Sequence, residues 1–352
     1  MMGTTGKSKI FDSTFEKGII DSHLIRLRFD SEKISTRLFT IVIQEGDYVK
    51  HQVNLNSKGS IMDGLNSSII KELAIVTPPI LSQSQIVSFL DQKTSIIDDL
   101  IHKKLRKIEL LKEQRTSIIN HAITKGLVKN VGMKDSKVIW IGEIPENWRI
   151  NKIKRLATTI SKGTTPSTIG KEMIEDGDIR FLKAENIKNN EVSFDPIFYI
   201  DIETDILLKR SSLMEGDILF VIAGATIGKT AILPYQFIPA NTNQAVSFIR
   251  LKQDENKRFV WYWLLSTRIQ EQISLVSVQS AQPNLSMEDL GNFQIPHPPL
   301  QEQLQIVEYL DKKTSEIDKQ VDLENRKIDL LKEYRQSLIS EVVTGKIDVR
   351  TN

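Results

Sequence analysis

The sequence contains no cysteine and no long hydrophobic run. Without cysteine the chain can form neither disulfides nor thiolate metal sites, which is consistent with a reducing compartment. No apolar stretch approaches the ~18 residues that a membrane span requires, and the N-terminal residues lack the apolar core of a signal peptide. We therefore predict a soluble, cytoplasmic protein with no membrane partner.

The sequence also lacks an excess of either charge. Its 47 Lys and Arg against 45 Asp and Glu give a net charge of +2, so the composition alone does not indicate nucleic acid as a partner. The chain has 352 residues and a 40% hydrophobic content, enough for two or more domains of ~100–200 residues each. We predict no metal site, because metal-ligand spacing is absent among the five histidines, at positions 23, 51, 102, 121 and 297.

Residues 217–233, DILFVIAGATIGKTAIL, have nearly the spacing of a phosphate-binding P-loop, with Ala223 in place of the first glycine. A P-loop needs a helix after the loop, because the helix N-terminus adds the positive end of its dipole to the phosphate site. Here the loop is followed by an apolar, β-like stretch and then by Pro234, which would interrupt a helix. We interpret the segment as a β-hairpin whose tip carries Thr226 and Lys229, and not as an NTPase site.

An internal repeat organises the chain. A shift of 220 residues aligns residues 86–124 with residues 306–344, and 20 of the 39 positions are identical. Neither copy contains proline or glycine, and both carry apolar residues three and four positions apart. Such a narrow apolar stripe is typical of a helix that packs on one partner helix. We predict that the copies are long helices, each about 60 Å over about forty residues, that pack on each other.

The region between the repeats, residues 138–296, alternates strand-like and helix-like segments. Residues 178–187, 217–224 and 244–251 favour strands, and residues 257–274 favour one helix. The aromatic residues of FVWYW, 259–263, could stack on bases, but at these spacings they are more typical of a hydrophobic core. This region is predicted to be an α+β domain.

Six motifs in this order give the chain its resemblance to a known family, the specificity subunits of Type I restriction-modification enzymes. They are IGEIPENWRINKIKRLA at 141–157, SKGTTPS at 161–167, FLKAENI at 181–187, GDILFVIAGATIGKTAIL at 216–233, NTNQAVSFIRL at 241–251, and SAQPNLSMEDLGNFQIPHPPLQEQLQIVEYLD at 280–311.

The resemblance implies an α+β fold of globular target recognition domains joined by two long antiparallel helices that form a coiled coil. It implies a non-catalytic protein in which each recognition domain reads one half of a split site in double-stranded DNA, while the helices fix the spacing. Methyltransferase subunits and a restriction (translocase) subunit would be the protein partners. S-adenosylmethionine, ATP and Mg would be bound by those partners, and this chain would hold no cofactor.

The sequence departs from the family pattern near its N-terminus. Residues 18–80 align with residues 239–300, but nothing before residue 18 corresponds to 138–235. We therefore expect half of the first recognition domain to be missing, its strand edges to be exposed, and one competent DNA reader; a second copy or a separate fragment could complete the first domain. The expected organisation is a half recognition domain at 1–80, a long helix at 81–126, a linker at 127–137, a complete recognition domain at 138–297, a second long helix at 298–345 and a tail at 346–352.

Candidate DNA-binding residues lie in predicted loops. Amide side chains can pair with adenine, and lysine can contact guanine or phosphate. Each residue could instead stabilise a turn, but as a set they favour DNA contact. The candidates are Lys162, Thr164, Thr165, Lys183, Glu185, Asn186, Thr226, Lys229, Asn243, Gln244, Gln279, Ser280, Gln282 and Asn284.

Two other functions compete with this interpretation. Residues 195–198, DPIF, differ at Ile197 from the Asp-Pro-Pro-Phe motif of amino-methyltransferases, and no glycine-rich cofactor loop follows an early strand. We therefore predict no catalytic residues. The remaining alternative is a decayed subunit that binds methyltransferase subunits through its helices without recognising a DNA sequence.

Overall fold

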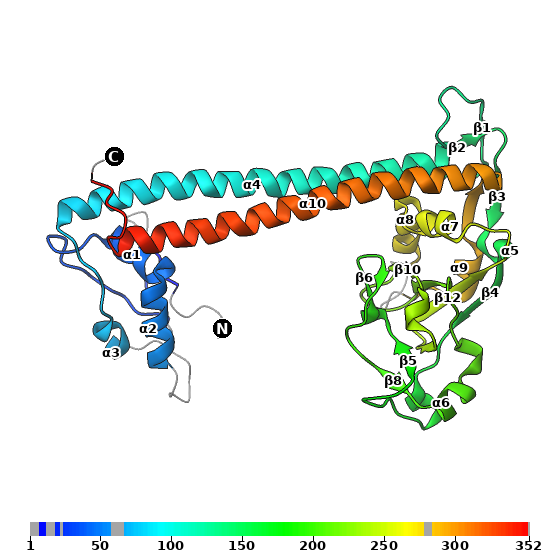
Figure 1. Cartoon of the computed structure of the whole chain (residues 1–352), viewed down its shortest axis with the longest axis horizontal. Helices are drawn as coiled ribbons and strands as arrows, with labels where there is room; N and C mark the ends of the chain where they lie inside the picture. Colours follow the sequence, from blue (N-terminus) through cyan, green and yellow to red (C-terminus); the bar gives the residue numbers. More distant parts are fainter. Residues whose placement is uncertain (1–6, 12–17, 22–23, 58–66, 278–283, 351–352) are drawn as a thin grey trace. The chain divides into compact units, whose positions relative to one another are not determined.

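The computed structural model describes residues 7–11, 18–21, 24–57, 67–277 and 284–350. It divides into two compact units. Unit 1 comprises Met1–Leu110 and Lys319–Asn352, and unit 2 comprises Leu111–Asp318. Two long helices, α4 (Ile80–Lys125) and α10 (Leu300–Val343), each contribute to both units (Figure 1).

The two long helices pack on each other in both units, as the repeat predicts. In unit 1, Leu90 near the start of α4 shares a buried cluster with Leu338 near the end of α10. In unit 2, Ile123 near the end of α4 shares a cluster with Leu310 near the start of α10. Because early residues of one helix meet late residues of the other, the pair is antiparallel.

Ion pairs between the helices occupy repeat-related positions. In unit 1, Arg335 on α10 donates to Asp98 on α4 at 2.9 Å. In unit 2, Arg115 on α4 donates to Asp318 on α10 at 3.1 Å. Since Arg115 corresponds to Arg335 and Asp98 to Asp318, the same contact is made twice.

Unit 2 has a layered architecture. A four-stranded antiparallel sheet has the order β10-β9-β12-β4, and a three-stranded sheet has the order β11-β5-β8, in which β11 and β5 are parallel. The strands are β4 (Ala157–Lys162), β5 (Ile179–Leu182), β8 (Tyr199–Ile200), β9 (Ile218–Val221), β10 (Thr230–Ile232), β11 (Ala240–Thr242) and β12 (Val246–Leu251). The predicted strands at 217–224 and 244–251 are confirmed in β9 and β12. The strand predicted at 178–187 is confirmed only over β5, because the 3-10 helix η2 (Ala184–Asn186) follows it.

The alternation of side chains along β9 and β12 explains the layers. Leu219 and Phe248 face a core shared with the three-stranded sheet. Ile218 and Ile249 face the opposite core, which the helices cover.

The remaining elements of unit 2 are β1 (Met133–Asp135), β2 (Glu143–Pro145), β3 (Arg149–Lys152), α5 (Ile153–Leu156), η1 (Pro166–Ile169), η2 (Ala184–Asn186), β6 (Ile187–Lys188), β7 (Glu191–Val192), α6 (Ile202–Leu207), η3 (Lys209–Ser211), η4 (Tyr235–Phe237), α7 (Lys257–Leu264), α8 (Thr267–Ser277), α9 (Met287–Asn292) and β13 (Gln294–His297).

The prediction of one helix over residues 257–274 is wrong, because two helices, α7 and α8, occupy the segment. The side chain of Ser266 accepts from the Ile269 amide at 3.4 Å, and Asn120 on α4 accepts from the Thr267 amide at 3.2 Å. These bonds satisfy the first amides of α8 and so stabilise a new helix start. The aromatic residues of 259–263 are buried, which confirms their prediction as core.

Unit 1 repeats the helical part of unit 2. It contains α1 (Thr36–Glu45), α2 (Asp47–Ser57) and α3 (Ser67–Glu72), followed by α4. A shift of 220 or 221 residues places α1, α2, α3 and α4 on α7, α8, α9 and α10. The N-caps correspond as well, because Ser35 caps α1 and Asn256 caps α7 with their side chains. The repeat therefore extends from the long helices to the helices packed on them.

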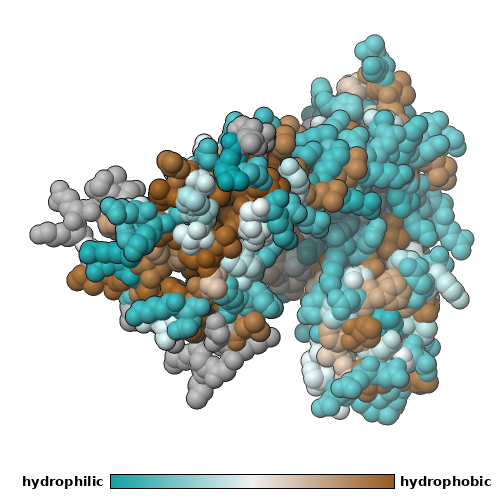
Figure 2. Space-filling view, turned by 60° about the vertical axis from the view of Figure 1, so that its left-hand side comes forward, coloured by the Kyte–Doolittle hydropathy of each residue, from teal (hydrophilic) through white to brown (hydrophobic). Residues whose placement is uncertain are grey.

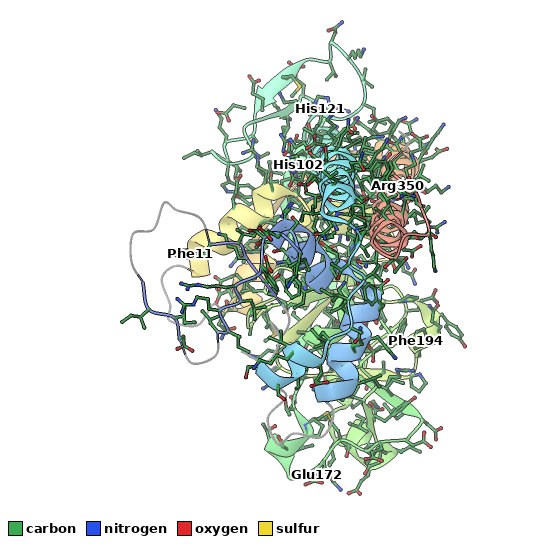
Figure 3. All side chains as sticks on the ribbon, turned by 90° about the vertical axis from the view of Figure 1, so that its left-hand side faces the viewer. Phe11, His102, His121, Glu172, Phe194 and Arg350 are labelled. Atoms are coloured by element: carbon green, nitrogen blue, oxygen red, sulfur yellow. The ribbon has the colours of Figure 1, made fainter. Side chains whose placement is uncertain are left out.

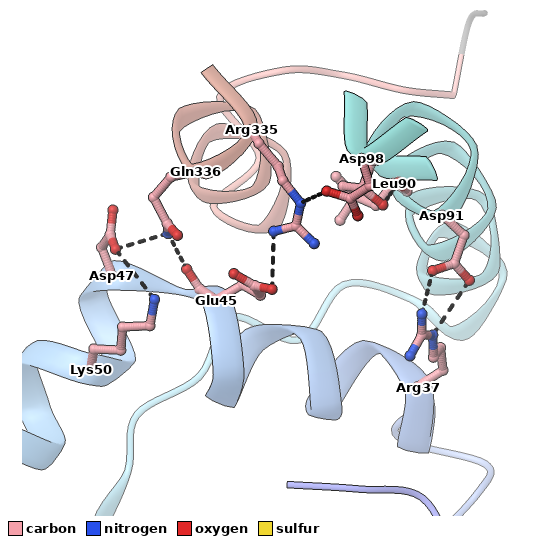
Figure 4. Close-up of polar contacts among 10 residues, drawn as sticks. Arg37, Glu45, Asp47, Lys50, Leu90, Asp91, Asp98, Arg335 and Gln336 are labelled. Atoms are coloured by element: carbon pink, nitrogen blue, oxygen red, sulfur yellow. Dashed lines mark hydrogen bonds and ion pairs between the residues drawn. The ribbon is translucent and has the colours of Figure 1, made fainter. Parts of the chain in front are cut away.

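Polar contacts that hold α1 are also repeated in unit 2. Arg37 on α1 forms an ion pair with Asp91 on α4 at 2.6 Å in unit 1 (Figure 4). The corresponding residues Arg258 and Asp311 form the same ion pair in unit 2. In unit 1, Arg335 additionally donates to Glu45 at 3.0 Å at the end of α1.

The described helices include none with the length and apolarity needed to cross a membrane. Over the same part of the chain, no three acidic or histidine side chains are grouped to hold a metal ion. Figure 3 marks two of the histidines, His102 and His121, on the helix α4.

Candidate nucleic-acid interface

Three strands of the four-stranded sheet present their loops at one edge. Strands β4 and β9 end at this edge, and the antiparallel strand β12 begins there, with Val246 opposite Val221 and Ser247 opposite Lys162. The loops that follow β4 and β9 therefore lie beside the loop that precedes β12. We call this edge the loop edge, and it comprises residues 162–165, 183–185, 222–229, 242–245 and 284.

The parallel pair β5 and β11 adds a further loop to the loop edge. Leu182 lies opposite Thr242, and the Thr242 hydroxyl donates to the Leu182 carbonyl at 2.7 Å. Because parallel strands end on the same side, Lys183 and Asn243 follow their strands at neighbouring positions. A long-range pairing thus brings Lys183 to the other candidates.

The loop after β4 is joined directly to the loop before β12. The Thr164 amide donates to the Thr242 carbonyl at 3.2 Å, and the Thr165 hydroxyl donates to the Gln244 side-chain oxygen. Gly163 makes this close approach possible, because a Cβ there would meet the Thr242 carbonyl oxygen at 1.7 Å. Glycine is therefore required at this position if the two loops are to touch.

Residues 217–233 form the predicted hairpin. Strands β9 and β10 are antiparallel, with Phe220 opposite Thr230, and a strand stands where a P-loop would have a helix. Gly224 and Gly228 adopt φ of +89° and +88°, and the Lys229 amide donates to the Thr226 carbonyl at 3.2 Å. The tip exposes the Lys229 side chain and partly exposes Thr226.

The base of the hairpin is fixed by a buried ion pair that sequence reasoning missed. Asp217, almost fully buried before β9, accepts from the Arg250 guanidinium on β12 at 2.8 and 2.7 Å. Two parallel bonds to one carboxylate give the pair a defined orientation. A carboxylate directly before an apolar strand was the only signal for it in the sequence.

The polar segment before α9 reaches the hairpin through Asn284. Asn284 is exposed and pairs with Ala223, while the Leu285 amide donates to the Ile222 carbonyl at 2.8 Å. The other candidates of this segment, Gln279, Ser280 and Gln282, lie outside the described residues.

Asn186 is a correction to the candidate set. Its side chain is buried, its oxygen accepts from the Lys183 amide at 3.0 Å, and its nitrogen donates to the carbonyls of Ser193 and Pro196 at 3.1 and 2.7 Å. The carboxamide is fully used in holding the turn after β5. Asn186 therefore positions Lys183 and has no free group for a base.

Lys183 is partly buried, and its ammonium lies 3.7 Å from the centre of the Phe198 ring and 3.9 Å from the Glu185 carboxylate. The ring and the carboxylate both attract the cation, so they restrict its side chain. Glu185 is exposed beside it.

The loop edge carries unbalanced positive charge. Lys162 and Lys229 form no ion pair with any residue in the described part of the chain. The loop edge also carries hydroxyl and amide groups at Thr164, Thr165 and Gln244. Ammonium groups suit phosphates, and side-chain hydroxyls and amides suit base edges.

Comparison with known proteins identifies the family. The model of a family described as the Type I restriction modification DNA specificity domain matches residues 1–110 and 145–333, most of the chain. The chain belongs to this family. Its membership supports DNA specificity over the alternative of a subunit that only binds methyltransferases, and the predicted resemblance is confirmed.

Individual specificity subunits match over nearly the whole chain. The Type I restriction enzyme MjaVIII specificity subunit of Methanocaldococcus jannaschii is 27% identical over 344 residues, covering 95% of this chain and 76% of the relative. The EcoBI specificity subunit of Escherichia coli is 24% identical, covering 94% of this chain and 70% of the relative.

Solved structures share the fold. A chain from a study of complex assembly and conformational transition of the type I R-M system superimposes with a TM-score of 0.70 at 15% identity, covering 90% of this chain and 73% of that chain. The HsdS subunit of Thermoanaerobacter tengcongensis gives a TM-score of 0.50 at 15% identity, covering 90% and 72%. The α+β fold class predicted for a specificity subunit is thus confirmed.

Proposed function

We propose that unit 2 reads one half of a bipartite DNA target through the loop edge. The observation that supports this most is the convergence of candidate side chains from five separate segments at one edge of the sheet. A core needs no such gathering of lysine, threonine and amide side chains that are exposed or partly exposed. A surface that must contact both phosphates and base edges does.

In this proposal two kinds of side chain on the loop edge have different roles, since lysines bind phosphates and amides contact bases. Lys162 and Lys229 neutralise phosphates and set the orientation of the duplex. Gln244 and Asn284 are exposed amides that can pair with a base edge. The hydrogen bond from Thr165 holds the Gln244 side chain in place before DNA arrives, which reduces the cost of ordering it on binding.

The chain acts in this proposal as a non-catalytic scaffold as well as a reader. The paired helices α4 and α10 would bind methyltransferase subunits, which a restriction subunit joins, and those subunits would bind S-adenosylmethionine, ATP and Mg. Acting on DNA, the complex would work in the cytoplasm.

Replacement of Gln244 by alanine tests the proposal. In a complex of this chain with its methyltransferase, Gln244→Ala should relax discrimination at one base pair of the target by about 1–3 kcal/mol, as expected for a lost amide-to-base contact. The measurement is the sequence distribution of methylated adenines in cells carrying the variant.

Lys129→Ala provides the control, since Lys129 is an exposed residue of unit 2 outside the loop edge. It should leave the methylated sequence unchanged. The proposal fails if the wild-type complex methylates without sequence preference, or if Gln244→Ala leaves every position of the recognised sequence unaltered.

A further inference from the structure

The loop at the tip of the hairpin between β9 and β10 is held near both of its ends. Near its start, the Leu285 amide donates to the Ile222 carbonyl at 2.8 Å. Near its end, the Gly228 carbonyl accepts from the side-chain amide of Gln270 on α8 at 3.2 Å. The first contact joins two backbone groups, whereas the second depends on one side chain, so a substitution at Gln270 can remove it.

Gln270 is itself fixed at the junction of α7 and α8. Its Nε2 group also donates to the Leu264 carbonyl at the end of α7 at 3.2 Å, and its backbone amide donates to the Ser266 carbonyl at 3.2 Å. The start of α8 is joined to α4, because the Asn120 side chain donates to the Thr267 hydroxyl at 2.9 Å and accepts from the Thr267 amide at 3.2 Å. Two contacts about one turn of α8 apart thus connect α4 to the hairpin tip.

The hairpin packs closely on α8 at this contact. Gly228 has a φ of +88°, and a Cβ there would lie 2.6 Å from Oε1 of Gln270 and 3.2 Å from Cδ1 of Ile273. Hydrophobic residues reach the surface at several places in Figure 2, whereas Ile227 packs against the core cluster that contains Ile273. The backbone directly before Lys229 therefore lies against α8, with no room for a side chain at position 228.

A helix does not need glutamine at this position in order to begin. The corresponding residue of α2 in unit 1 is Lys50, whose ammonium lies 4.0 Å from the Asp47 carboxylate. The contact with the long helix is present in both units, since Ser340 on α10 donates to Asp47 at 3.0 Å where Asn120 on α4 contacts Thr267. A carboxamide at position 270 is thus explained by the hairpin contact and not by the start of the helix.

We infer that Gln270 is a positioning residue for DNA binding, because it fixes the Gly228 carbonyl on α8 and so fixes the backbone that carries Lys229. This inference rests on the proposed function, in which Lys229 contacts a phosphate. Since the Lys229 side chain is exposed, its location depends on the backbone beneath it. A backbone that is held before DNA arrives reduces the cost of ordering the hairpin on binding.

Replacement of Gln270 by methionine tests the inference. Gln270→Met keeps a side chain of similar size and helix propensity but removes the donor, so the fold should be retained. Gln303→Met is the matched control, because Gln303 is a buried glutamine of unit 2 that donates to the Pro298 carbonyl, outside the loop edge.

Hydrogen exchange of the full chain without DNA gives the first readout. Exchange in a peptide covering residues 223–229 should be about fivefold faster in Gln270→Met than in the wild type, the factor expected for the loss of one hydrogen bond. Gln303→Met should leave exchange in this peptide unchanged, even where it lowers the Tm.

DNA binding by the methyltransferase complex gives the second readout. Gln270→Met should reduce the magnitude of the slope of log K against log salt by about 0.9, as Lys229→Ala should. The two substitutions together should reduce it no further, because both remove the same phosphate contact. Gln303→Met should keep the wild-type slope, since a loss of stability alone does not change the number of phosphate contacts.

The inference is overturned by unchanged exchange at residues 223–229 in Gln270→Met, or by an equal acceleration in Gln303→Met. It is also overturned if Lys229→Ala reduces the slope and Gln270→Met does not, or if the two reductions add. Exchange is measured without DNA, so its outcome is independent of whether unit 2 reads a sequence. A slope unaltered by Lys229→Ala would instead refute the phosphate contact in the proposed function, and the inference with it.

Discussion

Glu324 is a carboxylate enclosed between the long helices in unit 1, with a side chain only 4% exposed. It accepts from Lys104 at 2.9 Å, from Lys107 at 2.9 Å and from Lys327 at 3.4 Å. The hydrogen bonds from Lys104 and Lys107 lower the pKa of Glu324 to about 2. A carboxylate with these partners stays ionised in the folded protein at pH values where it would be protonated in the unfolded chain.

Glu324→Gln should therefore lower the thermal stability at pH 7 and change its pH dependence. Because folding lowers this pKa, the contribution of Glu324 is fully present above about pH 4.5 and is lost as the pH falls towards about 2. The difference in Tm between the wild type and the variant should shrink over that range.

Thermal unfolding followed by circular dichroism between pH 2 and 7 measures this difference. Glu333→Gln, at an exposed position on the same helix, is the control and should show no comparable trend. A constant difference between wild type and Glu324→Gln across the range would contradict the assignment.

At the scale of elements, the starts of the two long helices use one residue type in two different ways. Gln83 in α4 makes three hydrogen bonds, to the Ser35 amide and the carbonyls of Lys33 and Pro78. The corresponding Gln303 in α10 donates to the Pro298 carbonyl at 3.0 Å, and its side-chain oxygen has no partner among the described residues. Only in unit 1 does this glutamine join the helix to the segment before α1.

Gln83→Ala should consequently destabilise unit 1 more than Gln303→Ala destabilises unit 2. Both variants leave a similar cavity, but the first loses two more hydrogen bonds, each worth about 0.5–1.5 kcal/mol. We expect the excess to be about 1–3 kcal/mol. Hydrogen exchange of the amides of α1 and α7 reports the stability of the two units separately. An equal loss of protection from exchange in α1 of Gln83→Ala and in α7 of Gln303→Ala would refute the expectation.

The sequence predicted the secondary-structure elements better than it predicted the tertiary contacts between them. The repeat predicted the helix pair because identical apolar stripes need a partner, and Pro234 together with the β-like stretch predicted the hairpin. The break at Ser266 could not be foreseen, because the amide that stabilises the start of α8 comes from Asn120, distant in the chain. Asn186 shows the same limit, since an asparagine after a strand fits a base contact and a turn equally well until its burial is known.

At the scale of the whole molecule, the net charge of +2 supplies little general attraction to DNA. Attraction must then come from local groups such as Lys162 and Lys229 on the loop edge. Their role as DNA contacts remains a prediction, as does that of the other described residues of the loop edge.

The double variant Lys162→Ala/Lys229→Ala should weaken DNA binding by the methyltransferase complex and reduce its salt dependence. Each lost phosphate contact lowers the slope of log K against log salt by about 0.9, so the double variant should lose roughly 2 from the slope. Affinity measured by fluorescence anisotropy from 50 to 300 mM salt gives the slope. Lys129→Ala should retain the wild-type slope, and an unchanged slope in the double variant would remove both lysines from the interface.

Lys104 and Glu324 occupy the same position in the two copies of the repeat, and they touch each other. An ancestral single-copy chain that dimerised through this helix would have set two identical side chains against each other there, either two ammonium groups or two carboxylates. Opposite charges can face each other there only because the two copies differ at this position. The contact therefore favours the pairing of the two different helices over the pairing of two identical ones.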